Sequence, residues 1–392
     1  MLVSISPIGF AMNIGIFTDT FTPEINGVVT SIQSFIAIFE KQGHEVFLFA
    51  PNAGFTTEQA PERHTRRYPS VLVWGKQIRL SVPMIRTSVV EPLKLDVIHV
   101  QSPGPIGMAA VRIGKKLNIP LVYTYHTRVE KYAHFYLHWP EWTENSTYRL
   151  LAKTFYNRFD VIVTPSLGIK NELAKYIKKP MVVVPTGVNA WECQQLAASC
   201  SRTKILQRYD LETTDQLLIT ASRLGKEKNI TFIIDSLCEA LLTNPRVKLL
   251  IAGDGPDKDD LVEYVKQKKC GSNVIFLGFV SHAELFALYQ ASKAFVFASL
   301  TETQGLVVLE AFAMGLPVVA VKAVGVEDMV SGDVGGYLVE QEAYFFAKKA
   351  SLLLQDQTVW NKKHEEALHR AEEYSIERMA GKILGLYQSL LK

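Results

Sequence analysis

Two glutamates, Glu302 and Glu310, are separated by seven residues and stand on either side of the start of a helical pattern at 306–314. An apolar, strand-like run at 294–298 precedes them. We therefore expect one carboxylate in the loop before a helix N-terminus and the other about a turn and a half inside that helix. The exposed amides of a helix N-terminus attract anions. The stretch suits a ligand that carries a phosphate and several hydroxyl groups.

A second group of candidates is the loop after the apolar run 216–220, which contains Arg223, Lys226 and Lys228. Arginine presents a planar fork to phosphate oxygens and lysine a point charge. A cluster of cations between a strand and a helix is equally typical of a solvated surface. The Gly-Asp-Gly-Pro sequence at 253–256 is interpreted as a structural turn.

Two further candidates lie in the first half of the chain. Gly27 precedes a helical pattern at 28–42, where a glycine lets the backbone approach an anion closely. A plain turn explains it equally well, and the Gly-x-Gly-x-x-Gly signature of a dinucleotide fold is absent. His126 directly follows the apolar run 121–125, and its simpler interpretation is a polar residue that closes a strand.

The elements that must position these residues form a regular alternation of strands and helices. We expect strands at 13–17, 45–49, 96–100, 121–125, 160–163, 181–184, 216–220, 247–252, 273–277, 294–298 and 317–321. Continuously apolar strands that alternate with helices predict an α/β fold whose parallel sheets are covered on both faces. Ligands bind at the carboxyl ends of such strands, where the candidate residues stand. At ~150 residues per domain, the 392 residues allow two domains, with a boundary in the turn-rich stretch 185–189.

Charge is unevenly distributed between the two halves. Residues 1–189 carry 20 Lys/Arg against 13 Asp/Glu, a net of +7, whereas residues 190–392 carry 22 against 26, a net of −4. The first half is therefore the one expected to seek an anionic surface. No uncharged apolar run reaches the ~20 residues of a membrane span, so any membrane contact should be peripheral.

Cysteine usage and the N-terminus indicate an intracellular protein. The four cysteines show no Cys-x-x-Cys spacing, which argues against a disulfide framework or a zinc site and favours reduced thiols. Residues 1–17 are uncharged but lack the basic start and the cleavage site of a signal peptide. We interpret 13–17 as the first strand and leave open whether Met1 or Met12 is the true start.

Taken in order, these loops resemble the GT-B-fold retaining glycosyltransferases that use sugar nucleotides and carry a Glu-x7-Glu motif. Within that family, the sequence most resembles bacterial diacylglycerol glucosyltransferases. The resemblance rests on Ile-Gly-Ile-Phe-Thr-Asp-Thr (14–20), Asn-Gly-Val-Val (26–29), Tyr-His-Thr (125–127), Val-Pro-Thr-Gly-Val (184–188), Ser-Arg-Leu (222–224), Glu-Lys-Asn (227–229), Ala-Gly-Asp-Gly-Pro (252–256) and Glu-Thr-Gln-Gly-Leu-Val-Val-Leu-Glu-Ala (302–311).

The resemblance implies two Rossmann-like, doubly wound parallel-sheet domains that face a central cleft. Domain 1–189 would bind the acceptor and would be completed by a C-terminal helix, at about 376–392, that crosses back to it. Domain 190–375 would bind the nucleotide sugar.

The resemblance also implies roles for individual residues. Glu310 would bind the ribose hydroxyls, Glu302 the donor sugar ring, and Arg223 with Lys228 the diphosphate. His126 would sit beside the reacting sugar and acceptor, which makes His126, Glu302, Arg223 and Lys228 the predicted catalytic set. Further donor contacts are expected at Gly27, Val280, Gln304, Gly305 and Leu306.

The chemistry agrees with these residue types. Cleavage of the sugar–phosphate bond builds charge on the leaving diphosphate, which cations and helix N-termini stabilise. No metal is needed if these cations do the work, so we expect no metal and no cofactor, and the family implies a front-face, retaining mechanism. A two-carboxylate glycosidase is the alternative. It fits poorly, because the two glutamates serve different parts of the donor and the cations would be idle.

Two stretches of the basic first half, residues 1–189, are candidates for the acceptor or membrane side. Residues 63–90 contain no Asp or Glu, and residues 131–142 are rich in amphipathic aromatics. Each cation near an anionic leaflet is worth ~1 kcal/mol. A solvated loop and a locally packed aromatic cluster are the alternatives, and the second stretch departs from the simple Tyr-Glu-Asp-Tyr pattern of the relatives. The residues expected on the acceptor or membrane side are Arg63, Arg66, Arg67, Trp74, Arg79, Tyr132 and Trp139.

The predicted function is transfer of glucose from UDP-glucose to a lipid such as 1,2-diacylglycerol, forming an α-glycolipid. The enzyme would be cytoplasmic, peripheral on the inner face of the membrane, with no nucleic-acid partner. Alternatives are a mannosyl- or other hexosyltransferase on a phospholipid or soluble glycan, a nucleotide-sugar epimerase, and a catalytically idle sugar-nucleotide-binding protein. The base, the hexose, the acceptor and the oligomeric state remain open.

Overall fold

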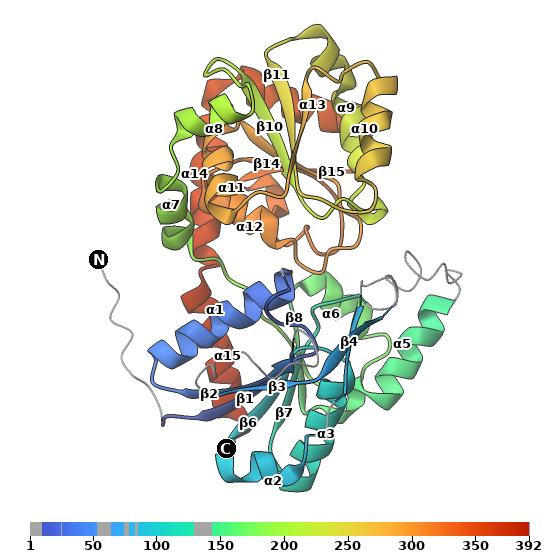
Figure 1. Ribbon diagram of the computed structural model, residues 1–392, viewed down its shortest axis with the longest axis vertical. Coiled ribbons are helices and arrows are strands. Elements are labelled where there is room, and N and C mark those ends of the chain that lie inside the picture. Colours follow the sequence, from blue (N-terminus) through green and yellow to red (C-terminus); the bar gives the residue numbers. More distant parts are fainter. Residues whose placement is uncertain are drawn as a thin grey trace. The chain divides into compact units, whose positions relative to one another are not determined.

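The computed structural model describes residues 10–24, 26–52, 64–73, 78–82, 85–128 and 143–391, with only the backbone described at 72–73, 78–80 and 143–145. The chain forms two compact units (Figure 1). The first unit contains Met1–Gly187 and Ile376–Lys392, and the second contains Val188–Ser375. The sequence places the break two residues later, after residue 189.

The first unit is built on a parallel sheet with the strand order β3-β2-β1-β6-β7-β8-β9. Its strands are β1 (Asn13–Phe17), β2 (Glu45–Pro51), β3 (Thr65–Tyr68), β6 (Val97–Val100), β7 (Leu121–Thr124), β8 (Val161–Thr164) and β9 (Met181–Val183). The central strands are almost wholly buried, as their continuous apolar sequence requires when helices cover both faces. A separate antiparallel hairpin, β4 (Ser70–Val73) and β5 (Ile78–Ser81), follows β3.

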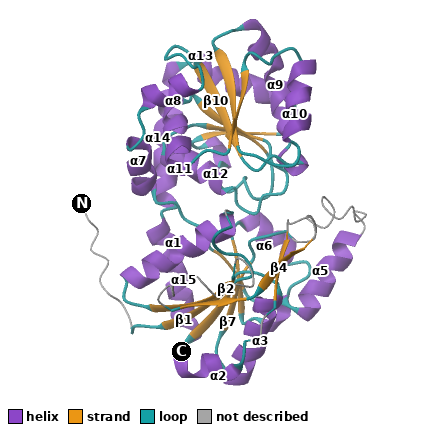
Figure 2. Ribbon diagram, viewed as in Figure 1, coloured by secondary structure: helices purple, strands orange, loops and turns teal. Residues whose placement is uncertain are grey.

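The helices of the first unit flank its sheet, and the last helix of the chain is one of them (Figure 2). They are α1 (Gly27–Lys41), α2 (Thr87–Val90), α3 (Pro105–Leu117), α5 (Thr143–Thr154), α6 (Leu167–Leu173) and α15 (Ile376–Leu390), with short 3-10 turns η1 (Glu91–Leu93) and η2 (Tyr156–Arg158). On α15, the Tyr387 ring packs edge-on against Phe39 of α1, and its hydroxyl lies 2.5 Å from His99 Nδ1. The predicted return of the C-terminal helix to the first domain is confirmed.

The second unit repeats the architecture with the parallel strand order β12-β11-β10-β13-β14-β15. Its strands are β10 (Gln216–Ala221), β11 (Val247–Ala252), β12 (Val274–Gly278), β13 (Ala294–Phe297), β14 (Val318–Val321) and β15 (Gly336–Val339). Side chains of β10 alternate between two cores: Leu217 and Ile219 join one, and Leu218 joins the other. Both faces of the sheet are therefore covered, and the predicted pair of Rossmann-like parallel-sheet domains is confirmed.

The helices of this unit are α7 (Ala190–Ala198), α8 (Arg202–Arg208), α9 (Ile230–Thr243), α10 (Lys258–Gln267), α11 (His282–Ala291), α12 (Leu306–Ala313), α13 (Ala343–Gln355) and α14 (Gln357–Glu373), with 3-10 turns η3 (Lys226–Lys228) and η4 (Ser331–Asp333). The strands that the sequence did not predict are β15 and, in the first unit, β3, β4 and β5. Edge strands such as β3, with the sequence Thr-Arg-Arg-Tyr, are polar and lack the apolar run that reveals a central strand. Among the described residues, no helix has the length and apolarity to cross a bilayer.

Candidate active site

The predicted phosphate-binding loop begins at the carboxyl end of β10 and leads into η3. Arg223 stands at its start with a side chain 41% exposed, and its Nη2 lies 2.8 Å from the Glu227 carboxylate. The Glu227 side chain is almost fully buried, so its carboxylate is a fixed partner for the Arg223 guanidinium group. Glu227 is a site residue that the sequence analysis did not single out.

Lys228 and Glu302 form the most direct contact of the site. Lys228 Nζ donates to Glu302 Oε1 over 2.5 Å, and the two side chains are only 15% and 19% exposed. Ser299 Oγ donates to the same carboxylate oxygen over 2.9 Å. The structure thus brings together two residues of the predicted catalytic set that are 74 positions apart in the sequence.

The loops that carry this pair are joined through their backbones. The Leu300 amide donates to the Glu227 carbonyl over 3.1 Å, which ties the loop after β13 to η3. Burial raises the pKa of the Glu302 carboxyl, but the Lys228 charge and the hydrogen bonds from Lys228 and Ser299 outweigh it, and the net result is a lowered pKa. The Glu302 carboxylate is therefore ionised at neutral pH and pairs with the Lys228 ammonium group.

The second glutamate lies within α12, as the sequence predicts. Gly305 precedes this helix with a φ of +79°, a conformation that favours glycine. Burial raises the pKa of Glu310, while the charge of His282 lowers it in part. Gln304 is buried, and Leu306 is the first residue of α12. Val280 follows the carboxyl end of β12 and packs against the apolar core of the unit.

Two glycines position these loops by close contact. The sequence analysis interpreted Gly253 as part of a turn and did not mention Gly325. A Cβ on Gly253 would lie 1.8 Å from the Ser222 carbonyl oxygen, directly before Arg223. A Cβ on Gly325 would lie 2.3 Å from the carbonyl oxygen of Glu302. Such approaches are open only to glycine, so these positions fix the backbones of the cation loop and the carboxylate loop.

In the first unit, His126 follows β7 and bonds to a residue at the end of β6. Its Nε2 lies 2.7 Å from Gln101 Oε1, which identifies Gln101 as a partner that the sequence analysis missed. Burial lowers the pKa of His126 to about 4, and that of the neighbouring His99 to about 3 with help from the His126 charge. His126 is therefore neutral at physiological pH, with its Nε2 within hydrogen-bond distance of the Gln101 side chain.

Acidification from pH 6.5 to 4 is expected to destabilise the wild type more than a His126→Gln variant. In this window the unfolded chain binds a proton at His126 and the folded chain does not, because its pKa is lowered from 6.5 to about 4. The stability that neutral, buried His126 contributes is fully present above pH 6.5 and is lost as the pH falls towards 4. Urea unfolding of both proteins across this range measures the difference, and parallel pH dependences would show that the histidine is not buried in its neutral form.

Gly27 begins α1, but its neighbours are already engaged. The Asn26 side chain accepts hydrogen bonds from the Val28 and Val29 amides, each over 3.0 Å. This N-cap satisfies two of the amides that an anion would otherwise use. An anion at this helix would have to bind the Gly27 backbone itself or displace the cap.

The residues expected on the membrane side are only partly described. Arg63, Trp74, Tyr132 and Trp139 lie outside the described residues, as does the side chain of Arg79, whose backbone belongs to β5. Arg66 is exposed on β3.

Arg67 has an internal role. Its guanidinium donates to the carbonyl and hydroxyl of Thr22, each over 2.9 Å, and lies over the Phe21 ring. It braces the loop after β1, and its place on the acceptor or membrane side stays a prediction. In the described part of the chain, no group of three or more His, Cys, Asp or Glu side chains is arranged to hold a metal.

Two protein-family models match the chain. Residues 201–378 match the family described as glycosyl transferases group 1, and residues 25–192 match glycosyltransferase family 4. Alpha-monoglucosyldiacylglycerol synthase of Streptococcus pneumoniae is 33% identical over 318 residues, which cover 79% of this chain and 71% of that enzyme. The enzyme of the same name from Acholeplasma laidlawii is 29% identical over 326 residues, 79% of this chain and 80% of the relative.

A solved structure is also similar throughout. Anabaena HepE in complex with UDP and glucose superimposes with a TM-score of 0.72 at 18% identity, covering 96% of this chain and all of that one. The two parallel-sheet units agree with these matches. The chain belongs to the group 1 glycosyltransferase family, has the GT-B fold, and is a hexosyltransferase.

Proposed function

We propose that this enzyme transfers glucose from UDP-glucose to diacylglycerol with retention of configuration, forming an α-glucolipid. The observation that carries the proposal is the Lys228–Glu302 pair beside Arg223, which offers cations for a diphosphate and a carboxylate for sugar hydroxyls. The names of the two relatives above supply the choice of glucose and of diacylglycerol. We further propose that the enzyme works at the inner face of the cell membrane without a metal.

In the proposed reaction the bond between the anomeric carbon and the diphosphate oxygen breaks as the acceptor hydroxyl attacks from the same face. The acceptor proton passes to the leaving diphosphate. Lys228 and Arg223 stabilise the charge that develops there, which is where preorganised cations lower a barrier most. As Lys228 turns to the phosphate, Glu302 is released to accept hydrogen bonds from the sugar. Neutral His126 orients hydroxyl groups beside the reacting carbon.

The test is a product analysis with three donors. Purified protein is incubated with UDP-glucose, UDP-galactose and GDP-mannose in turn, with anionic vesicles that contain diacylglycerol, and the lipid is analysed by mass spectrometry and by NMR of the anomeric proton. We expect a hexosyl-diacylglycerol of α configuration from UDP-glucose, unchanged by a metal chelator. Consumption of the donor with no lipid product would refute the proposal and favour an epimerase. Sugar found on a phospholipid or on an added soluble glycan would assign a different acceptor.

Glu310→Ala is expected to raise the KM for the nucleotide sugar by about 10- to 100-fold with little change in kcat, because a hydrogen bond to a charged group is worth roughly 1.5–3 kcal/mol. Its proposed partners, the ribose hydroxyls, take no part in the bond that breaks. Steady-state kinetics with varied donor concentration provide the measurement. Glu365→Ala on the exposed side of α14 is the matched control. A loss confined to kcat would place Glu310 at the reacting centre instead.

A further inference from the structure

Two cysteines of the second unit lie next to each other although they are far apart in the sequence. Cys238 belongs to α9, and Cys270 lies between α10 and β12. The Cys270 thiol is within hydrogen-bonding distance of the Cys238 thiol, and both thiols are free. Burial and this neighbouring thiol raise the pKa of the Cys270 thiol, while the Lys268 charge lowers it in part. The candidate active site uses neither cysteine.

Contacts on both sides of the pair hold the two segments together. Lys268 Nζ pairs with Asp235 Oδ1, three residues before the cysteine of α9, over 2.6 Å. Asn273 Nδ2 donates to the Leu241 carbonyl, three residues after that cysteine, over 2.5 Å. The segment 268–273 therefore runs alongside α9, and its cysteine stands opposite the cysteine of α9, between the two contacts.

The two thiols differ in their access to water. Cys270 is 1% exposed and belongs to the apolar core that also contains Leu237 and Leu241 of α9. Cys238 follows Leu237 at the edge of the buried face of α9 and is partly exposed. A diffusible oxidant can therefore reach Cys238, whereas Cys270 is shielded from it.

A disulfide matches this pair better than a metal ion does. Structural zinc takes four ligands. In the part of the chain that the structure describes, no three or more His, Cys, Asp or Glu side chains gather around an ion-sized site. Two sulfurs within hydrogen-bonding distance need only side-chain rotations to approach the separation of about 2 Å in a disulfide. Two-electron oxidation is thus the chemistry that the pair can perform without a further ligand.

We propose that Cys238 and Cys270 form a reversible disulfide when the protein meets hydrogen peroxide, and that this bond stabilises the second unit. The Cys238 sulfur attacks one peroxide oxygen, so that an S–O bond forms, the O–O bond breaks and water leaves, which gives a sulfenic acid. The Cys270 sulfur then attacks the Cys238 sulfur. An S–S bond forms, the S–O bond breaks, and the departing hydroxide takes the Cys270 proton as a second water. Two thiols are oxidised, and the peroxide is reduced to two waters.

The disulfide closes the loop 238–270 and cross-links α9 to the segment before β12. Such a link stabilises a fold mainly by restricting the unfolded chain. An external thiolate can reverse it by attack at the more exposed sulfur, that of Cys238. Because Cys270 precedes β12, it lies at the amino-end edge of the parallel sheet, opposite the edge that carries the candidate active site. The inference therefore concerns stability and does not depend on the proposed function.

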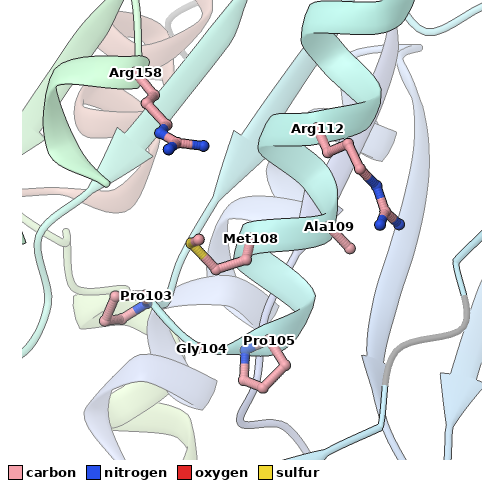
Figure 3. Close-up of a pocket in the computed structure, with 7 residues that line it drawn as sticks. All are labelled: Pro103, Gly104, Pro105, Met108, Ala109, Arg112 and Arg158. Atoms are coloured by element: carbon pink, nitrogen blue, oxygen red, sulfur yellow. The ribbon is translucent and has the colours of Figure 1, made fainter. Parts of the chain in front are cut away.

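The test treats the reduced, full-length protein with hydrogen peroxide and maps its cysteines by mass spectrometry of non-reduced peptides. Met108, which is 42% exposed and lines a groove on the first unit (Figure 3), reports the dose, because exposed thioethers are oxidised to sulfoxides. At the dose that converts Met108, we expect a peptide link between Cys238 and Cys270. The Tm should rise by roughly 5–15 °C and return to its starting value after dithiothreitol.

Two serine variants separate the pair from oxidation in general. Cys238→Ser should form no link to Cys270 and show no rise in Tm. The matched control is Cys200→Ser, which removes another partly exposed thiol of the same unit and should behave like wild type. Circular dichroism establishes that each reduced variant is folded, and the wild-type map and Tm test the proposal by themselves if a variant does not fold.

An unmodified Cys238 at the dose that converts Met108 would overturn the proposal. So would a sulfinic acid at Cys238 without the link, or a link between two chains. A disulfide that leaves Tm unchanged or lowers it would show that the folded chain does not place the thiols for this bond. An equal rise in Tm in Cys238→Ser would assign the stabilisation to oxidation elsewhere.

Discussion

Lys228→Ala is expected to lower kcat by about 10²- to 10³-fold, the usual effect of removing one preorganised group that stabilises charge in a transition state. Lys228 is held within 2.5 Å of Glu302 and is largely shielded from water, so its charge acts in a medium that screens it weakly. The measurement is single-turnover transfer from UDP-glucose at saturating donor. Because the substitution also leaves the Glu302 carboxylate without its cation, donor affinity should fall as well.

Lys226→Ala provides the matched control for this change. Lys226 belongs to the same 3-10 turn and carries the same charge, but its side chain is exposed. An exposed cation is screened by water and contributes little, so the variant should keep near wild-type turnover. Equal losses in the two variants would mean that the turn acts through its total charge. Unchanged turnover in Lys228→Ala would remove Lys228 from the catalytic set.

Gly253→Ala is expected to destabilise the second unit by about 3 kcal/mol, from overpacking and from a backbone conformation that L residues avoid. The glycine has a φ of +125°, and a Cβ would come within 1.8 Å of the Ser222 carbonyl oxygen. For a domain of this size, a change of about 3 kcal/mol lowers Tm by roughly 6–12 °C. Displacement of Ser222 would also move Arg223, so the folded fraction should bind the donor more weakly.

Gly278→Ala separates the two causes of this loss. Gly278 also has a positive φ, +66°, but a Cβ there would meet nothing within 4 Å. Gly278→Ala should lower the free energy of unfolding by only about 1–2 kcal/mol, the cost of the left-handed conformation. Thermal unfolding of both variants gives the comparison. Equal decreases in Tm would show that close packing of the Gly-Asp-Gly-Pro turn against the cation loop contributes nothing.

The alternation of elements was readable from the sequence because each central strand is buried on both faces. A strand covered by helices on either side must be apolar at consecutive positions, and this local pattern needs no partner to be recognised. β1 and β11 accordingly have the predicted bounds. The edge strand β3 was missed because an edge is half-exposed and can be polar, as in Thr-Arg-Arg-Tyr. Arg67, in that strand, braces the loop after β1, a contact that the sequence did not predict.

The sequence alone was enough to predict the fold class, which follows from local patterns, and the return of the C-terminal helix, which the ordered family motifs imply. Which of the predicted residues contact one another is visible only in the folded chain. Lys228 reaches Glu302 because β10 pairs with β13 in the sheet although β11 and β12 separate them in the chain, so their carboxyl ends are neighbours. Strand order and helix docking are set by long-range burial, which no short segment of sequence contains.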